Sequence, residues 1–311
     1  MTTPPLDAVT GAFGYTGKYI ARRLLALGRR VITLTGHPHR PSPFGQAVRA
    51  IPFHFDQPHE LARSLEGVAT LYNTYWVRFT HGSVTFDQAV QNTQTLIRAA
   101  QEAGVRRFVH VSIANPSADS PLPYYRGKAL LERTLIESGL SHAILRPTVL
   151  FGGDEGGQDV LINNIAWLLR RFPLFAVPGD GQYRIQPMHV EDMAALAVEV
   201  GQQAENLTLD AVGPEIYTFN ELVALLARAV GSRAKIVHLP PSAALFLSSL
   251  VGLVVRDQVL TRDELRGLMA DLLVSGQPPT GTTRLSEWLA QHTDEVGRHY
   301  ASELGLSLIH I

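Results

Sequence analysis

Cysteine is absent from this chain of 311 residues. Its absence excludes disulfide bonds, thiolate ligands for a metal ion and a cysteine nucleophile. Lysine is nearly absent as well, because Lys18, Lys128 and Lys235 are the only lysines among the 27 basic residues. Lysine can lose its proton inside a protein, whereas arginine stays charged. The few lysine positions are therefore candidates for proton chemistry.

Neither sign of charge is in excess, since 27 lysines and arginines face 28 aspartates and glutamates and the formal net charge is −1. No block of basic residues stands out. We therefore expect neither nucleic acid nor an anionic membrane surface as the main partner. His189 stands close to Glu191 and Asp192, but no second histidine follows at the spacing of metal ligands. We predict a structural hydrogen bond there and no metal site.

Long hydrophobic runs are also missing. The most apolar run, residues 243–255 (AALFLSSLVGLVV), is shorter than the roughly 20 residues that cross a bilayer. We predict a buried or amphipathic helix at this place and no transmembrane segment. The sequence does not open on a charged and then apolar signal segment, which favours a cytoplasmic protein.

What the sequence does contain is a strand, a glycine turn and a helix near its start. An apolar run leads into Thr10 and the glycines Gly11, Gly14 and Gly17, and apolar residues then recur at helical spacing up to Gly28. Glycine allows a positive φ angle, and the helix start offers unpaired N–H groups to a pyrophosphate. The spacing G-x-x-G-x-x-G differs from the common G-x-G-x-x-G, yet its place between strand and helix predicts a dinucleotide site.

Apolar strands alternate with helices through the first half of the chain. Hydrophobic residues make up 45% of the sequence, which can support a sizeable core. Near-continuous apolar strands are typical of a parallel sheet that is buried on both faces. We predict an α/β fold with a Rossmann-type doubly wound parallel sheet and a smaller, mostly helical C-terminal substrate lobe. Residues 1–150 form the NAD(P)-binding domain, completed by about residues 186–212, and residues 151–311 form the lobe. The predicted strands are residues 31–35, 50–56, 69–76, 108–113 and 142–146, after the first at residues 6–9.

Tyr124 and Lys128 carry the candidate chemistry. They lie four residues apart on the helix predicted after the fifth strand, so their side chains share one face. A tyrosine normally titrates near 10, and an adjacent ammonium favours its phenolate, so the pair can pass a proton to or from a carbonyl or alcohol. The structural alternative is a packed tyrosine and a solvated lysine.

These motifs recur in one known superfamily. Thr10-Gly11-x-x-Gly14-x-x-Gly17, Asp56, Asn92, Tyr124-x-x-x-Lys128 and Arg146-Pro147-Thr148 together resemble the extended or atypical branch of the short-chain dehydrogenases/reductases. His189-Val190-Glu191-Asp192 is most similar to the NADPH-binding accessory subunits of respiratory complex I and to NmrA-like proteins. The resemblance implies that Asp56 meets the adenine amino group and that the segment after Pro147 lines the nicotinamide pocket. As alternatives, Asp56 is a turn residue and Asn92 is a helix-bending or surface residue.

The sequence departs from the pattern of active members in two places. Such enzymes have a serine or threonine near the end of strand five, where this chain offers Ser112 followed by Ile113. If the family's serine falls one residue later, Ile113 replaces it. The fourth strand also ends in Asn73, Thr74, Tyr75 and Trp76, so aromatic side chains are expected to crowd the nicotinamide site.

Two functions of different classes remain open. The first is an NAD(P)(H)-dependent oxidoreductase, epimerase or dehydratase acting on a small carbonyl or alcohol, with Tyr124, Lys128 and Ser112 as the catalytic residues. The second is a non-catalytic NADP(H)-binding accessory or redox-sensing protein. We favour the enzyme, because Tyr124 and Lys128 are both present. The sequence indicates neither the substrate nor the oligomeric state.

The nucleotide is predicted from the end of strand two. NAD-preferring sites place an acidic side chain there, but this chain has Thr35, Gly36 and His37, with Arg40 available to neutralise a 2′-phosphate. We therefore predict NADP(H), with NAD(H) as the alternative. The residues predicted to bind the cofactor are Gly11, Phe13, Gly14, Tyr15, Thr16, Gly17, Thr35, Gly36, His37, Arg40, Asp56, Asn73, Lys128, Pro147 and Thr148.

Overall fold

The computed structural model describes residues 4–77, 80, 85–154 and 159–302. The chain divides into two compact units. Of the described residues, the first contains 4–77, 80, 85–146 and 193–209, and the second contains 147–154, 159–192 and 210–302. No helix within the described ranges is long and apolar enough to cross a membrane.

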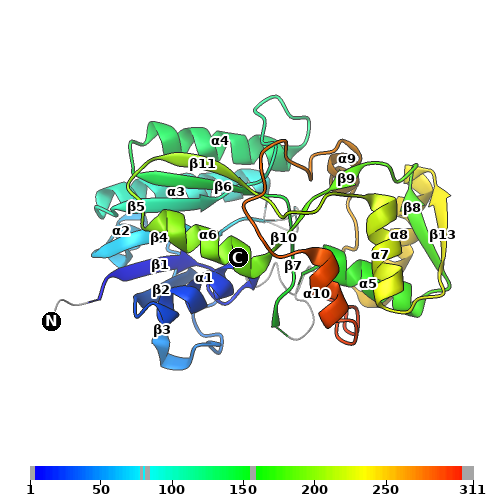
Figure 1. Cartoon of the computed structure of the whole chain (residues 1–311). Helices are drawn as coiled ribbons and strands as arrows, with labels where there is room; N and C mark the ends of the chain where they lie inside the picture. The colour runs from blue at the N-terminus through cyan, green and yellow to red at the C-terminus, as the bar shows by residue number, and fades with distance from the viewer. Residues whose placement is uncertain (1–3, 78–79, 81–84, 155–158, 303–311) are drawn as a thin grey trace. The chain divides into compact units, whose positions relative to one another are not determined.

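A seven-stranded sheet forms the centre of the first unit (Figure 1). Its order is β11-β6-β5-β4-β1-β2-β3, and the pairings among β1 to β6 are parallel. This confirms the predicted Rossmann-type fold. The order reverses between β1 and β4, the position at which open α/β sheets bind ligands beyond the carboxyl ends of their strands. The strands are β1 (Leu6–Thr10), β2 (Arg30–Thr35), β3 (Val48–Pro52), β4 (Val68–Asn73), β5 (Arg107–Val111), β6 (His142–Pro147) and β11 (Leu207–Ala211).

Helices cover both faces of this sheet because its strands are apolar on both sides. Leu71 of β4 and Phe108 of β5 belong to a core that also contains residues of α2, α3 and α4. Tyr72 alternates with Leu71 and faces the other way, where its ring lies so close to Gly201 of α6 that no Cβ would fit there. The helices are α1 (Tyr15–Ala26), α2 (Pro58–Ser64), α3 (Phe86–Glu102), α4 (Pro123–Glu137) and α6 (Val190–Gly201), with a short 3-10 turn at Gly45–Ala47.

Three strands end earlier than the sequence predicts. The third ends at Pro52 instead of Asp56, because His54 adopts a positive φ of 46° that extended backbone does not allow. The fourth ends at Asn73 instead of Trp76. There the amides of Thr74 and Tyr75 turn away from the ladder to donate to the Thr10 hydroxyl. The fifth ends at Val111, so Ser112 lies just beyond its strand.

The second unit combines helices with short two-stranded sheets. Residues of α5 and α7 form its core together with side chains of α9 and α10. The pairs are β7 with β10, β8 with β13, and β9 with β12. The elements are β7 (Val149–Phe151), α5 (Leu161–Arg171), β8 (Leu174–Pro178), β9 (Arg184–Ile185), β10 (Pro187–His189), β12 (Tyr217–Thr218), α7 (Phe219–Ala229), β13 (Lys235–Leu239), α8 (Pro241–Val255), α9 (Arg262–Met269) and α10 (Leu285–Gln291).

Helix α8 corresponds to the apolar run that the sequence predicts as a buried or amphipathic helix. The buried alternative is wrong, since Ala244 is the one residue of this helix that is buried. The helix packs against β8, which leaves most of its large side chains in solvent.

Helix α5 holds the segment of residues 293–301 by its backbone. Asn163 donates to the carbonyl of His299 and accepts from the amide of Gly297, both at 2.9 Å. Asn164 makes the same pair of bonds with Ala301, and Arg170 and Arg171 donate to further carbonyls of the segment. Gly297, at a φ of 72°, lies so close to α5 that a Cβ would stand 2.5 Å from the carbonyl carbon of Ala166.

Candidate functional site

The turn between β1 and α1 has the geometry that the glycine motif predicts. Gly11 adopts a φ of 65°, and its carbonyl accepts a 2.9 Å hydrogen bond from the amide of Gly14. At Gly17 a Cβ would stand 2.8 Å from the carbonyl carbon of Gly11. Glycine at this position therefore lets the helix start directly against the turn.

The start of α1 is suited to an anion. Gly14 is its N-cap, and the first turn has neither a side-chain cap nor an acidic residue. The first amides of a helix have no intrahelical partners, and the dipole adds positive potential. Phe13, Tyr15 and Thr16 lie in or beside this turn, next to the point where the strand order reverses. The predicted pyrophosphate residues are thus adjacent in the structure.

The loop after β2 presents exposed side chains. Thr35 is buried, and its hydroxyl accepts a 3.1 Å bond from the amide of His37. Gly36, His37 and Arg40 are exposed, and the amide of Arg40 closes a turn on the carbonyl of His37. Within the described residues the Arg40 guanidinium has no ion-pair partner. It can therefore take a phosphate without breaking an existing interaction.

Asp56 lies in an exposed turn beyond β3. Phe53 and Phe55 next to it stack at 4.7 Å between ring centroids, and both contact the ring of Tyr75. Asn92 of α3 donates a 2.8 Å bond to the Tyr75 hydroxyl. Asn92, which is half-buried, thus supports an aromatic cluster.

Asn73 is bound within a chain of buried hydrogen bonds at the reversal point. The Thr10 hydroxyl donates to Asn73 Oδ1 at 3.1 Å, and Asn73 Nδ2 donates to His110 Nδ1 at 3.0 Å. The imidazole therefore carries its proton on Nε2, which has no partner within the described residues. Burial and the charge of Lys128 hold the pKa of His110 well below its ordinary value, so the ring is neutral. Sequence reasoning missed His110, whose signal is a polar residue in an otherwise apolar strand.

Lys128 lies in the interior, only 2% exposed, so the solvated alternative is wrong. Its Nζ donates a 2.8 Å bond to the carbonyl of Val111 and stands 4.4 Å from the centroid of the Trp76 ring. Burial lowers the pKa of Lys128 to about 7, although the charge of Glu132 acts in the opposite direction. The lysine thus exchanges a proton near neutral pH.

Trp76 lies over the helix face that carries the candidate pair. Its ring meets that of Tyr124 edge to face at 5.4 Å, and one of its carbons lies 3.0 Å from where a Cβ of Gly127 would be. Phe86 also contacts the Tyr124 ring. The indole N–H of Trp76 is buried and has no partner within the described residues. The predicted aromatic crowding thus falls on Tyr124 and Lys128.

Ser112 is committed to a carboxylate that sequence reasoning did not single out. Its hydroxyl donates to Glu132 Oε1 at 2.5 Å, and the same carboxylate is held by Arg146 through Nε at 3.0 Å and a terminal nitrogen at 2.5 Å. Glu132 is buried and follows Lys128 by one helical turn. Spacing on the helix could have found it, because residues four apart share a face.

Pro147 and Thr148 fall in the second unit. Pro147 ends β6, and the Thr148 hydroxyl donates to the carbonyl of Gln186 within that unit. The side-chain amide of Gln186 donates a 2.9 Å bond to the carbonyl of Gly213 and so continues this network.

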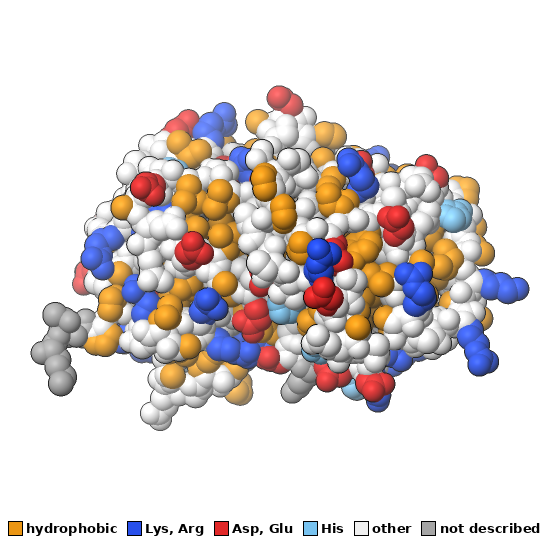
Figure 2. Space-filling model, viewed as in Figure 1, with side chains coloured by type: hydrophobic (Ala, Val, Ile, Leu, Met, Phe, Trp, Pro, Cys, Tyr) orange, Lys and Arg blue, Asp and Glu red, His pale blue; other side chains and the backbone are white. Residues whose placement is uncertain are grey.

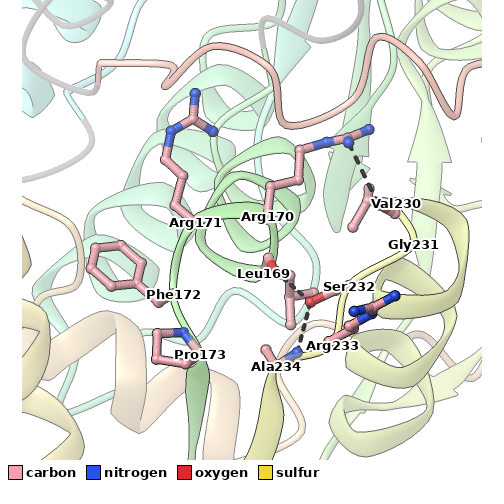
Figure 3. Close-up of a pocket in the computed structure, with 10 residues that line it drawn as sticks. All are labelled: Leu169, Arg170, Arg171, Phe172, Pro173, Val230, Gly231, Ser232, Arg233 and Ala234. Carbon is pink, nitrogen blue, oxygen red and sulfur yellow. Dashed lines mark hydrogen bonds between the residues drawn. The ribbon is translucent and has the colours of Figure 1, made fainter.

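A separate hollow of about 410 Å³ lies in the second unit between the end of α5 and the turn at residues 230–234 (Figure 3). Arg170 and Arg171 line it, but their guanidinium groups bind backbone carbonyls of the segment 293–301. Ser232 donates to the carbonyl of Leu169 across the hollow. Of its three arginines, Arg171 and Arg233 are exposed and Arg170 is half-buried.

Comparison with known proteins decides the family. The model of the NAD(P)H-binding family matches residues 11–166, half of the chain. The chain belongs to this family. It fits the atypical short-chain dehydrogenases/reductases within it, as the motifs predict.

Its relatives in this family are distant. The chain is 22% identical to subunit 9 of the mitochondrial NADH dehydrogenase 1 alpha subcomplex from Arabidopsis thaliana, over 86% of this chain and 70% of that protein. It is 23% identical to the photosystem II assembly factor Ycf39 of Synechocystis, over 78% of this chain and 72% of that protein.

Solved structures show the same fold. MoeE5 in complex with UDP-glucose and NAD has a TM-score of 0.69 at 22% identity, over 94% of this chain and 99% of that one. The UDP-glucuronic acid 4-epimerase of Bacillus cereus with NAD reaches the same score at 17% identity, over 95% and 99% of the two chains.

Proposed function

We propose that this NAD(P)H-binding chain holds NADP(H) at the β1–α1 turn as an accessory or redox-sensing protein. The single observation that carries the proposal is the state of Ser112. Its hydroxyl already donates to Glu132, and Arg146 fixes that carboxylate. A serine that orients a substrate oxygen must give up this bond, which leaves a buried carboxylate less well solvated.

The position of Trp76 supports the same conclusion. Its ring stands against both Tyr124 and Lys128, so the helix face that would serve a substrate is packed with the protein's own side chain. The binding half of the site carries no such obstruction, because α1 begins without a side-chain cap and Arg40 is exposed. These features favour binding over turnover.

A second candidate is an oxidoreductase, epimerase or dehydratase acting on a small carbonyl or alcohol. Tyr124 and Lys128 favour it, since they lie one helical turn apart and burial brings the pKa of Lys128 to about 7. In this candidate Tyr124 passes the proton and Lys128 holds the ribose. MoeE5 is described with UDP-glucose, which makes nucleotide sugars the first substrates to screen.

One titration and one screen distinguish the two. Nucleotide fluorescence with NADPH and NADH measures binding, and turnover is then followed with carbonyls, alcohols and nucleotide sugars. Binding without turnover supports the accessory protein. Turnover that falls by about 10² to 10⁴ in Tyr124→Phe would establish the enzyme instead. Binding of neither nucleotide overturns both candidates.

Ser112→Ala supplies an independent readout. If the serine serves the structure, the variant lowers the free energy of unfolding by about 1 kcal/mol and leaves nucleotide affinity unchanged. If it serves catalysis, the variant lowers the rate of any turnover found in the screen without that loss of stability.

A further inference from the structure

Helix α8 presents a stripe of exposed apolar side chains. Phe246 is 63% exposed, Leu253 76% and Val254 77%, and Leu247 and Leu250 each exceed 40%. These positions follow the pattern i, i+1, i+4, i+7 and i+8, which places them along one side of a helix. We call these five residues the α8 stripe. A stripe of this size on a protein surface marks an interaction site.

The opposite side of the helix faces the protein. Ala244 is buried there, and Leu245, Ser248 and Val251 are half-buried where α8 packs on β8. The α8 stripe is therefore the outer face of a helix that is already anchored. Its exposure is not the result of a helix that lacks a support.

Exposed cations outnumber exposed acids in the segment that carries the α8 stripe. Residues 231–264 contain the basic residues Arg233, Lys235, Arg256 and Arg262, all exposed. Of the acids in this segment, Asp257 is buried, Asp263 lies 3.6 Å from Arg266 and Glu264 caps Thr261. The helix itself has no charged residue, and Arg256 is its C-cap. Figure 2 shows positive and negative side chains interspersed on the face of the molecule that it draws. The net charge of −1 thus conceals a local excess of cations.

We infer that the α8 stripe and its flanking cations dock on an anionic phospholipid surface. Apolar side chains of an interfacial helix enter the boundary between headgroups and acyl chains, and nearby cations bind the lipid phosphates. Lys235 begins β13, the strand paired with β8, and so joins the cations to the element on which α8 rests. The inference is independent of the nucleotide function.

A second copy of this chain fits the surface less well. A symmetric pairing of two α8 stripes brings the same cations together from both partners, and like charges in an interface oppose association. The acids next to this segment compensate little, because Asp257 is buried, Asp263 pairs with Arg266 and Glu264 caps Thr261. The charge pattern therefore favours an anionic partner.

Vesicle flotation tests the inference with the full chain. We expect binding to vesicles of phosphatidylcholine mixed with phosphatidylglycerol at low salt, and much weaker binding to phosphatidylcholine alone. Leu253→Ser with Val254→Ser should weaken binding by at least about tenfold, because apolar area is no longer buried. Arg233→Gln with Lys235→Gln should weaken it by about thirtyfold, because each cation near an anionic surface contributes about a fivefold factor.

Matched controls separate docking from general stickiness. Leu27 and Ile136 are 56% and 52% exposed in the first unit, so Leu27→Ser and Ile136→Ser should leave vesicle binding unchanged. Arg106→Gln controls for the loss of an exposed charge. Circular dichroism and nucleotide affinity check that each variant is folded.

Two outcomes overturn the inference. One is an unmodified protein that fails to float with the anionic vesicles, and the other is equal flotation of the Leu253→Ser, Val254→Ser variant. Concentration-dependent dimers that this variant abolishes, without vesicle binding by the original chain, would identify a second copy as the occupant.

Discussion

At the end of β1 the groups suited to a ligand belong to the backbone, whereas at the ends of β4 and β5 they belong to side chains that are already paired. The turn at Gly11 and Gly14 leads into an uncapped helix. Beyond β5, Ser112 is bound by Glu132, and Lys128 lies under Trp76. The difference teaches that a glycine motif predicts a ligand site more directly than Tyr-x-x-x-Lys predicts catalysis. Backbone geometry follows from the fold, but the role of a side chain depends on neighbours outside its motif.

The largest expected effect is a loss of unfolding free energy when the paired side chains beyond β5 are separated. Arg146→Ala leaves Glu132 buried with Ser112 as its remaining hydrogen-bond partner among the described residues, and breaking a buried pair costs about 3 kcal/mol. We expect urea denaturation to show a loss of this size, with nucleotide affinity of the folded protein unchanged. Arg133→Ala, an exposed change on the same helix, should stay within about 0.5 kcal/mol. An equal, small loss in both variants would show that the pair is not structural.

The next largest effect is on dinucleotide affinity at the backbone turn between β1 and α1. Gly14 has a φ of −93° and a ψ of −176°, which any residue adopts, so Gly14→Val should fold. Its branched side chain stands at the helix start and should remove one or two charge-assisted hydrogen bonds to the pyrophosphate, each worth about 1.5–3 kcal/mol. We expect roughly 100-fold weaker dinucleotide binding by calorimetry. Gly276→Val, placed where nothing lies within 4 Å of the added Cβ, is the control. Unchanged affinity in folded Gly14→Val would move the binding site elsewhere.

A smaller effect tests the choice of nucleotide. Arg40→Ala removes an exposed cation after β2 and should weaken NADPH binding about tenfold while leaving NADH unaffected, since only NADPH has the 2′-phosphate. Arg30→Ala, also exposed and at the start of β2, should change neither affinity. Parallel titrations with both nucleotides measure the difference. Tighter binding of NADH by the original chain would contradict the predicted preference.

The paired side should also give the protein a pH-dependent stability. Burial lowers the pKa of Lys128 from the ordinary 10.5 to about 7, so between these values the unfolded chain holds a proton that the folded chain does not. Stability therefore rises with pH in this window, by about 1.4 kcal/mol per pH unit, and the contribution is level below pH 7. Lys128→Met should lose this rise, measured as the difference in unfolding free energy from the original chain at about pH 7 and pH 9. Parallel curves for the two proteins would mean that Lys128 is solvated.

Much of the fold could be predicted from the sequence because its signals are local. The apolar strands, Gly11 and the helix of Tyr124 and Lys128 each follow from nearby residues. The strand ends could not be predicted, since Thr10 takes the amides after Asn73 from a position far along the chain. The role of Ser112 was out of reach for the same reason, because its partner Glu132 lies on another element. The exposure of α8 was also missed, since an apolar helix in a sequence does not reveal which of its sides is covered.

The hydrogen bonds from α5 to the backbone of the segment 293–301 affect which substitutions this segment can accept. All the bonds described there end on main-chain atoms of the segment, so they do not depend on which side chains it carries. Asp294, Glu295, Arg298 and His299 are exposed, so we expect them to accept wide replacement, as in a library that presents grafted peptides. Gly297 is different, because its close approach to α5 admits no other residue. The backbone path of this surface loop is thus fixed by the side chains of α5 and not by its own side chains.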